Sequence, residues 1–149
     1  MFKHILVPTD GSSISHLAED QAIEFSRQVG AALTFIHVMP EAPFAVTDFS
    51  ESGHVDLRRP RQFVEHETGV DEKIIRRVLD KAETQGVTAA AVTETSDSPY
   101  LAIIGAAERL GCDLIFMASH GRKGLQALLL GSETQKVLTH CRIPVLVFR

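Results

Sequence analysis

Residues 114–135 read LIFMASHGRKGLQALLLGSETQ, and this stretch carries most of the information about the fold. It opens with an apolar run, Leu114–Met117, that predicts a buried strand, and it closes in a helix predicted over Glu133–His140. Ser132 and Gln135 have the spacing of a capping box, which predicts Ser132 as the N-cap. A glycine-containing loop between a strand and a helix N-terminus is a place where α/β proteins bind phosphate, because free N–H groups and the positive end of the helix dipole meet there.

Outward from this stretch, apolar strands alternate with amphipathic helices. Strands are predicted over Phe2–Val7, Ala32–Met39, Val87–Val92, Leu114–Met117 and Val145–Phe148, and helices over Ser12–Val29, Arg61–Gln85, Ser98–Leu110 and Glu133–His140. Such alternation predicts a parallel sheet covered by helices on both faces. We expect one α/β domain over residues 1–149, doubly wound and Rossmann-like, with strand order 3-2-1-4-5 and a flexible connection at about residues 40–60.

Composition narrows the classes of function. The chain has 149 residues, is 44% hydrophobic and 23% charged, and carries a net charge of −4, so no overall basic field predicts nucleic acid or an anionic membrane as a partner. No apolar run approaches the roughly 20 residues of a membrane span, and the N-terminal run is too short for a signal peptide. Cys112 and Cys141 lack metal-ligand spacing and are expected to be small buried hydrophobes. We therefore expect a cytoplasmic protein.

Several phosphate-binding and catalytic families are excluded by their motifs. The sequence contains no G-x-x-x-x-G-K-[ST], no G-x-G-x-x-G after the first strand, and no G-x-S-x-G. A receiver-type phosphoacceptor would need further acidic residues beside Asp10, together with a lysine near the fifth strand. The loop after Leu114–Met117 therefore matches none of these families.

Three segments resemble the universal stress protein family, and the resemblance extends over essentially the whole chain. Residues 5–12 (ILVPTDGS) resemble the first strand and turn of that family, and residues 35–38 (FIHV) resemble its second strand. The family's ATP-loop motif is G-x2-G-x9-G-[ST]. Here the corresponding residues are Ala118, Gly121, Gly131 and Ser132, followed by PVLV at residues 144–147.

The resemblance implies an ATP site with Mg²⁺ or Mn²⁺. It places the nucleoside against Pro8, Thr9, Asp10 and Val38. It wraps the ribose and phosphates with Ala118, His120, Gly121, Arg122, Lys123 and Gly124, and it assigns phosphate oxygens to Gly131, Ser132, Glu133 and Thr134. The divalent ion would bridge those phosphate oxygens.

The backbone conformations open to glycine and alanine affect how this motif could bind a nucleotide. Gly121 and Gly131 permit positive φ and a close backbone approach, as a phosphate cradle requires. Ala118 stands where the motif has its first glycine. Its methyl group opposes positive φ and is expected to crowd a ribose packed on the backbone.

Two polar residues have two interpretations each, and a third has one. Asp10 either caps a turn or holds the ribose or a metal-bound water. His120 either contacts phosphate or is an ordinary loop histidine. His37, inside a strand, is expected to be structural, since no second ligand has suitable spacing.

Three functions follow from these residues. The first is an ATP-binding regulatory module of the stress response with at most slow hydrolysis, because no general base is evident. The second is a nucleotide-free dimeric stress protein that acts through unknown protein partners, which Ala118 favours. The third is a Mg²⁺-dependent ATPase or phosphotransferase that uses Asp10. In each case, the apolar edge strand Val145–Phe148 predicts a homodimer.

Overall fold

The computed structural model describes residues 1–41, 60–120 and 130–149, with side chains from residue 69 onward in the second range. Its elements are β1 (His4–Pro8), α1 (Ser13–Val29), β2 (Ala32–Met39), α2 (Pro60–Thr84), β3 (Ala89–Thr95), α3 (Pro99–Arg109), β4 (Leu114–Ala118), α4 (Ser132–His140) and β5 (Val145–Phe148). The five strands form one parallel sheet in the order β3-β2-β1-β4-β5, as predicted. Residues 42–59, most of the predicted connection, lie outside the described residues.

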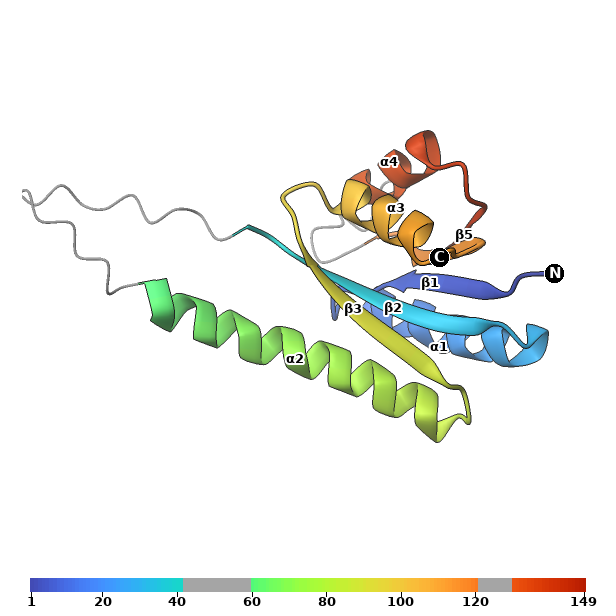
Figure 1. The fold of residues 1–149 in the computed structure, drawn as a ribbon, viewed down its shortest axis with the longest axis horizontal. Helices are drawn as coiled ribbons and strands as arrows, with labels where there is room; N and C mark the ends of the chain where they lie inside the picture. The colour runs from blue at the N-terminus through green and yellow to red at the C-terminus, as the bar shows by residue number, and fades with distance from the viewer. Residues whose placement is uncertain (42–59, 121–129) are drawn as a thin grey trace, which may run out of the picture.

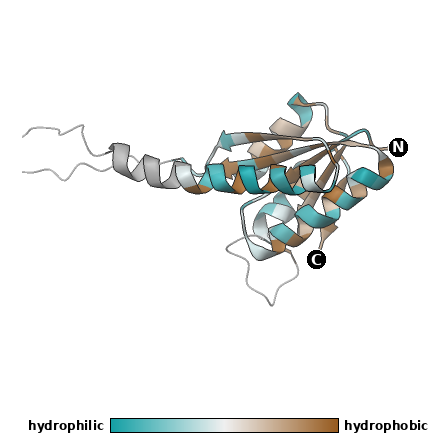
Figure 2. Cartoon of the chain, turned by 90° about the horizontal axis from the view of Figure 1, so that it is seen from below, coloured by the Kyte–Doolittle hydropathy of each residue, from teal (hydrophilic) through white to brown (hydrophobic). Residues whose placement is uncertain are grey.

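Helices cover both faces of the sheet (Figure 1). One apolar cluster joins the sheet to α1 and α2, and it includes Ile5, Phe35 and Val78. A second cluster joins the other face to α3 and α4, and it includes Ile36 and Ile103. Figure 2, seen from the side of α2, shows hydrophilic residues along the outer surface of this helix and hydrophobic residues in the strands behind it. The chain therefore builds two cores, one on each face of a continuous sheet.

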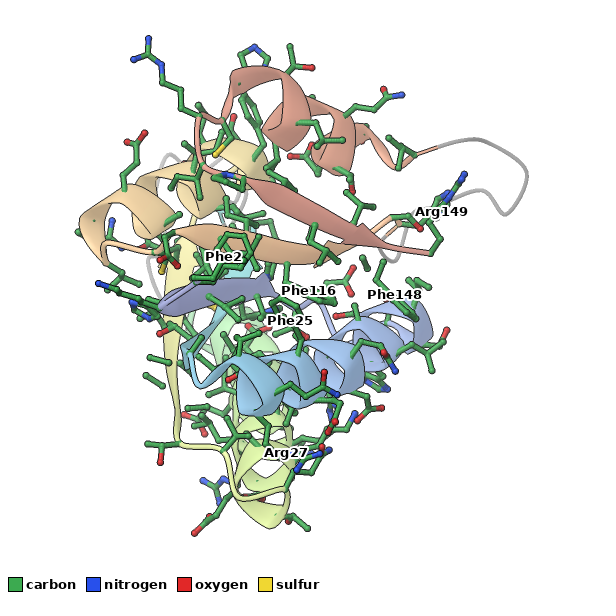
Figure 3. The ribbon with its side chains drawn as sticks, turned by 90° about the vertical axis from the view of Figure 1, so that its right-hand side faces the viewer. Phe2, Phe25, Arg27, Phe116, Phe148 and Arg149 are labelled. Carbon is green, nitrogen blue, oxygen red and sulfur yellow. The ribbon has the colours of Figure 1, made fainter. Side chains whose placement is uncertain are left out.

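Aromatic side chains fill the space between the sheet and α1 (Figure 3). Phe25 of α1 lies between Phe2 and Phe116, with ring centroids 6.3 and 6.1 Å away and tilted planes. These separations are typical of favourable aromatic pairs. They attach α1 to β4 and to the residues that precede β1.

Several boundaries differ from the predictions by one to three residues, and two of these differences have a physical reason. β3 was predicted over Val87–Val92 but runs over Ala89–Thr95, because it is an edge strand whose exposed side tolerates polar residues. The prediction that Ser132 caps the last helix is wrong, since Gly131 is the N-cap of α4. The Gly131 carbonyl accepts the Gln135 N–H at 3.0 Å, which starts the helix one residue earlier than predicted.

The amino end of the sheet is held by a carboxylate. Asp113, just before β4, accepts the backbone N–H groups of Lys3 and His4 at 2.9 to 3.0 Å. The pKa of Asp113 lies below its ordinary value of 3.8 chiefly because the His4 N–H donates to the carboxylate. The neighbouring Cys112 is buried, and this burial raises the pKa of its thiol to about 11. None of the helices in the described ranges is long and apolar enough to cross a membrane.

Candidate functional site

A pocket lies at the carboxyl ends of the central strands, where the order of the sheet changes direction. Eight of its lining residues are predicted site residues: Pro8, Thr9, Asp10, Val38, Ala118, His120, Glu133 and Thr134. Gly131 and Ser132 adjoin them in the chain, whereas Gly121, Arg122, Lys123 and Gly124 lie outside the described residues. Two segments more than one hundred residues apart therefore meet at one pocket, as expected for ligand sites of doubly wound sheets.

The first wall of the pocket is the β1–α1 turn, and Thr9 is its centre. Thr9 is buried, and each of its polar atoms has a partner. Its N–H donates to the Ile36 carbonyl at 2.8 Å, and its carbonyl accepts from His37 Nδ1 at 2.8 Å. Its hydroxyl donates to Glu19 Oε1 at 2.5 Å and accepts from the Ser15 hydroxyl at 3.0 Å. Thr9 therefore shapes the wall, and its hydroxyl is already engaged within the protein.

His37 connects this turn to α2. A carbonyl only accepts hydrogen bonds, so the contact with Thr9 places a proton on Nδ1 of His37. The other ring nitrogen, Nε2, lies 2.6 Å from Oδ1 of Asp71 on α2. Both nitrogens of this buried ring are used by the protein, which agrees with the structural role predicted for His37.

Glu19 makes a second connection between the same turn and α2. Its side chain is 0% exposed and receives both terminal nitrogens of the Arg77 guanidinium at 2.9 Å. Lys81 Nζ lies farther away, at 3.8 Å. A buried carboxylate needs such partners, because burying an unpaired charge is costly. The Thr9 hydroxyl completes the set of donors.

Asp10 forms the cap of the turn. Its Oδ1 accepts the Ser12 N–H at 2.9 Å, and its own N–H donates to the Ser15 hydroxyl at 3.3 Å. This is the Asx-turn arrangement that the turn-cap interpretation predicted. Among the described residues, no group of three or more His, Cys, Asp or Glu side chains could hold a metal ion.

The second wall is formed by the end of β4 and the start of α4, and backbone groups dominate it. The Gly131 N–H donates to the Ser119 carbonyl at 2.6 Å. The buried Thr134 hydroxyl donates to the carbonyls of Ala118 and Ser119 at 3.1 and 3.3 Å. The Thr134 side chain is therefore engaged, and what the described part of this wall can offer an anion is the N–H groups of the first turn of α4.

Gly131 is required by close packing and not by its φ angle. Its φ is −62°, so the expected use of positive φ is wrong at this position. A Cβ built on Gly131 would lie 3.0 Å from the Ser119 carbonyl oxygen and 3.3 Å from the His120 Cα. The close backbone approach that the motif predicts is thus present, and it occurs between two parts of the same wall.

Ala118 is also accommodated differently from the prediction. It lies within β4 and pairs with Phe148, and no non-glycine residue in the described ranges has positive φ. Its methyl group belongs to the cluster on the α1 face, together with Phe116. The apolar lining of the pocket, by contrast, comes from the opposite face, as with Ile103 and Met117. Strand alternation therefore turns this methyl away from the apolar lining of the pocket, an orientation that does not favour the expected crowding of a ribose.

Glu133 has a role that the sequence did not reveal. Its Oε2 accepts the Tyr100 N–H in the first turn of α3 at 2.9 Å, and its Oε1 pairs with Lys136 at 2.9 Å. Ser98 is the N-cap of α3, as predicted, but its side chain makes no cap hydrogen bond. Glu133 therefore supplies the acceptor at the N-terminus of α3 from the neighbouring helix.

Sequence reasoning missed several other lining residues: Ser15, Ile36, Pro99, Ile103 and Met117. Ile36 could have been found by strand alternation, because it lies two residues before Val38 and therefore on the same face of β2. Glu19, Arg77 and Asp71 carry no local signal, since their partners lie on other elements.

The fold defines a doubly wound α/β protein with a pocket at the switch point of its sheet. Comparison with known proteins identifies the family within this class. The family model described as "Universal stress protein family" matches residues 1–149, and this chain belongs to that family. It is 33% identical to universal stress protein YxiE of Bacillus subtilis, with 100% of both chains covered.

Solved structures agree with this assignment. The structure of MJ0577, a universal stress protein of Methanocaldococcus jannaschii, is similar with a TM-score of 0.81 and 27% identity, covering 99% of this chain and 95% of that chain. A universal stress protein in complex with cAMP has a TM-score of 0.71 at 22% identity, covering 99% and 97%. An Archaeoglobus fulgidus member in complex with dAMP has a TM-score of 0.66 at 14% identity, covering 100% and 98%. The last two show the shared fold.

Proposed function

We propose that this chain is a nucleotide-binding module of the stress response whose pocket takes an adenine nucleotide. ATP with Mg²⁺ or Mn²⁺ is the ligand set that the sequence resemblance implies. The single observation that carries the proposal is the meeting of Thr9 and Asp10 with the start of α4 around one pocket. Apolar side chains of Val38, Ile103 and Met117 offer a surface for a base, and the first turn of α4 offers N–H groups to a phosphate.

Two further facts support this proposal over its alternatives. Related structures of the same fold were solved with cAMP and dAMP, both adenine nucleotides. The nucleotide-free alternative depended on Ala118, whose methyl group lies on the other face of the sheet. We include at most slow hydrolysis in the proposal, because the Glu133 carboxylate is held by Tyr100 and Lys136 rather than poised as a general base.

Calorimetry and nucleotide extraction test the proposal directly. Purified protein is heat-denatured, and the supernatant is separated by ion exchange to detect adenine nucleotide that came with it. ATP is then titrated into the nucleotide-free protein with Mg²⁺ or Mn²⁺. We expect saturable binding. Absence of both released nucleotide and binding heat would refute the proposal.

A matched pair of variants locates the site. Val38→Trp fills the apolar part of the pocket and should weaken binding at least tenfold. Leu101→Trp adds the same side chain at an exposed position of α3, 55% exposed and outside the pocket lining, and should leave binding unchanged. Gly131 is a poor site for such a block, because its Cβ would strain the wall itself.

We further propose that the protein, a single cytoplasmic domain over residues 1–149, forms a homodimer through β5 and acts through protein partners. β5 is the last strand of the sheet, and its four residues Val145–Phe148 are all half-buried although apolar. An edge of this kind favours pairing with a second copy. Val147→Lys should shift the mass measured by light scattering from dimer to monomer, and Leu138→Lys on α4 should not. A wild-type monomer at micromolar concentration would contradict this.

A further inference from the structure

His37 joins the pocket to α2 through two hydrogen bonds that together need two ring protons. Its Nδ1 lies 2.8 Å from the Thr9 carbonyl oxygen, and its Nε2 lies 2.6 Å from Oδ1 of Asp71. A carbonyl and an ionised carboxylate only accept hydrogen bonds, so both ring nitrogens must carry a proton for both bonds to form. Asp71 is the ionised partner, because an imidazole holds a proton more tightly than a carboxylate does.

A neutral His37 can make only one of these two bonds. Asp71 offers a charge and the Thr9 carbonyl does not, and hydrogen bonds to charged acceptors are about twice as strong as neutral ones. The remaining proton therefore stays on Nε2, and the lone pair of Nδ1 then faces the Thr9 carbonyl oxygen. The ring is buried, so water does not replace the lost partner. Loss of the proton thus affects the pocket side of the connection first.

The affected carbonyl belongs to the peptide group between Thr9 and Asp10, and both of these residues line the pocket. His37 holds the carbonyl oxygen of this peptide group at 2.8 Å, and the N–H of the same group donates to the Ser15 hydroxyl at 3.3 Å. The bond to His37 is the shorter of the two. The orientation of this part of the pocket wall therefore depends on the proton at Nδ1.

The neighbouring elements bring further charged groups to Thr9 and His37. Among the described residues these are Asp71, Arg77 and Lys81 of α2, Glu19 of α1, and Asp10 of the β1–α1 turn. Glu19 bonds to Thr9 and is paired with Arg77 at 2.9 Å, and β3 places the uncharged Thr93 in register with His37. Within this set, the charge that contacts the ring directly is that of Asp71, so Asp71 is the residue to change in a test.

We propose that His37 is a positioning residue that ties ligand binding in the pocket to the protonation of its ring. The inference deepens the proposed function and rests on it. With a proton on each ring nitrogen, the peptide group between Thr9 and Asp10 keeps the orientation that the structure shows, and the pocket binds its nucleotide best. Histidine ordinarily titrates near about pH 6.5, so the affinity should be highest near pH 6 and fall as the pH rises to 8.5.

NMR of the ring nitrogens tests the proton arrangement in the wild-type protein. ¹⁵N spectra distinguish a protonated from an unprotonated ring nitrogen, and the His37 signals are assigned through their correlation with its backbone. As the pH rises, we expect Nδ1 to lose its proton while Nε2 keeps it. Asp71→Asn should reverse this tautomer, because the Asn amide can donate to Nε2 and leave the proton on Nδ1, facing Thr9. A neutral wild-type ring with its proton on Nδ1 overturns the inference.

Calorimetric titrations of ATP with Mg²⁺ at pH 6 and pH 8.5 test the effect on the pocket. Over this interval the wild-type Kd should rise by about fivefold more than the Kd of Asp71→Asn, the ratio that corresponds to one neutral hydrogen bond. Glu72→Gln removes the same charge from the next residue of α2, which is exposed, and should behave as the wild type does. The phosphates of ATP and the rest of the chain are the same in all three proteins, so their titration cancels in this comparison.

The outcomes distinguish this inference from the proposed function. Binding with the same pH dependence in the wild-type protein and in Asp71→Asn overturns the inference and leaves the proposed function standing. An equal loss of pH dependence in Glu72→Gln also overturns it, because the effect would then belong to the overall charge of α2. Absence of ATP binding at both pH values refutes the proposed function, and the inference with it.

Discussion

The two walls of the pocket are held by different kinds of interaction. In the β1–α1 wall, Thr9 is fixed by side chains from distant elements, namely Glu19 and His37, which are held in turn by Arg77 and Asp71 of α2. In the β4–α4 wall, most bonds run between the end of β4 and the start of α4 and involve backbone groups, such as the Gly131 N–H on the Ser119 carbonyl. The bond from Glu133 to the Tyr100 N–H is the exception.

This difference predicts how each wall responds to substitution. The first wall depends on ionisable side chains that are buried or half-buried, so charge and hydrogen-bonding capacity decide its stability. The second wall depends on the space between two backbone segments, so the size of the side chain decides. The second kind of wall is recognisable as a sequence motif because its requirement is local.

The largest effect is expected in the first wall. Glu19→Ala leaves the Thr9 hydroxyl without its acceptor and separates Arg77 from its partner. Arg77 is 34% exposed and can turn to water, so we place the loss at the low end for a buried pair, about 3 kcal/mol in the free energy of unfolding. Urea denaturation measures it. An Arg27→Ala control, which breaks an exposed pair with Glu24, should change the free energy of unfolding far less.

The second wall should respond to size. Gly131→Ala places a Cβ about 3.0 Å from the Ser119 carbonyl oxygen and should cost about 2 kcal/mol. Gly69→Ala in α2 is the matched control, because nothing lies within 4 Å of its Cβ and alanine favours a helix. Thermal unfolding should show a lower Tm for the first variant and a slightly higher Tm for the second. Equal behaviour of the two would remove the packing argument.

The His37 connection should depend on hydrogen bonding. Asp71→Ala removes the partner of Nε2 and should cost about 1.5 kcal/mol. Asp71→Asn should lose less than half of that, because its amide can donate to Nε2 while Nδ1 still donates to Thr9. Urea denaturation of both variants measures the difference. If Asn costs as much as Ala, the connection requires the charge of Asp71.

The smallest effect is expected at the other end of the sheet, away from both walls. Asp113→Asn should cost less than about 1 kcal/mol at pH 7, because Asn still offers one acceptor to Lys3 or His4. The pKa of Asp113 is lowered in the folded state, so its stabilisation is complete above the ordinary value of 3.8. It is lost as the pH falls through the lowered value.

Unfolding measured from pH 7 down to pH 2 checks this sign. The wild-type protein and Asp113→Asn should converge in stability at the acid end. A difference that stays constant to pH 2 would contradict the assignment. Nucleotide binding should be the same in both proteins, since Asp113 lies at the opposite end of the strands from the pocket.

The sequence by itself determined the order of elements, the parallel sheet and its strand order, and the position of the second wall. These depend on apolar runs, on glycine positions and on chain connectivity, all of which are local or follow from the handedness of crossovers. Cap assignment was less successful, because Ser132 satisfied a local pattern while the Gly131 bond to Ser119 decided where α4 begins.

Only the tertiary structure decided the partners of Thr9, the side to which the Ala118 methyl points relative to the pocket, and the bond from Glu133 to Tyr100. Glu19 and Arg77 are separated by 58 residues, and Glu133 and Tyr100 by 33. Nothing near either residue of such a pair indicates the other. The packing of α2 and α4 against their neighbours brings them together, because a buried charge or a helix N-terminus must find a partner wherever the fold provides one.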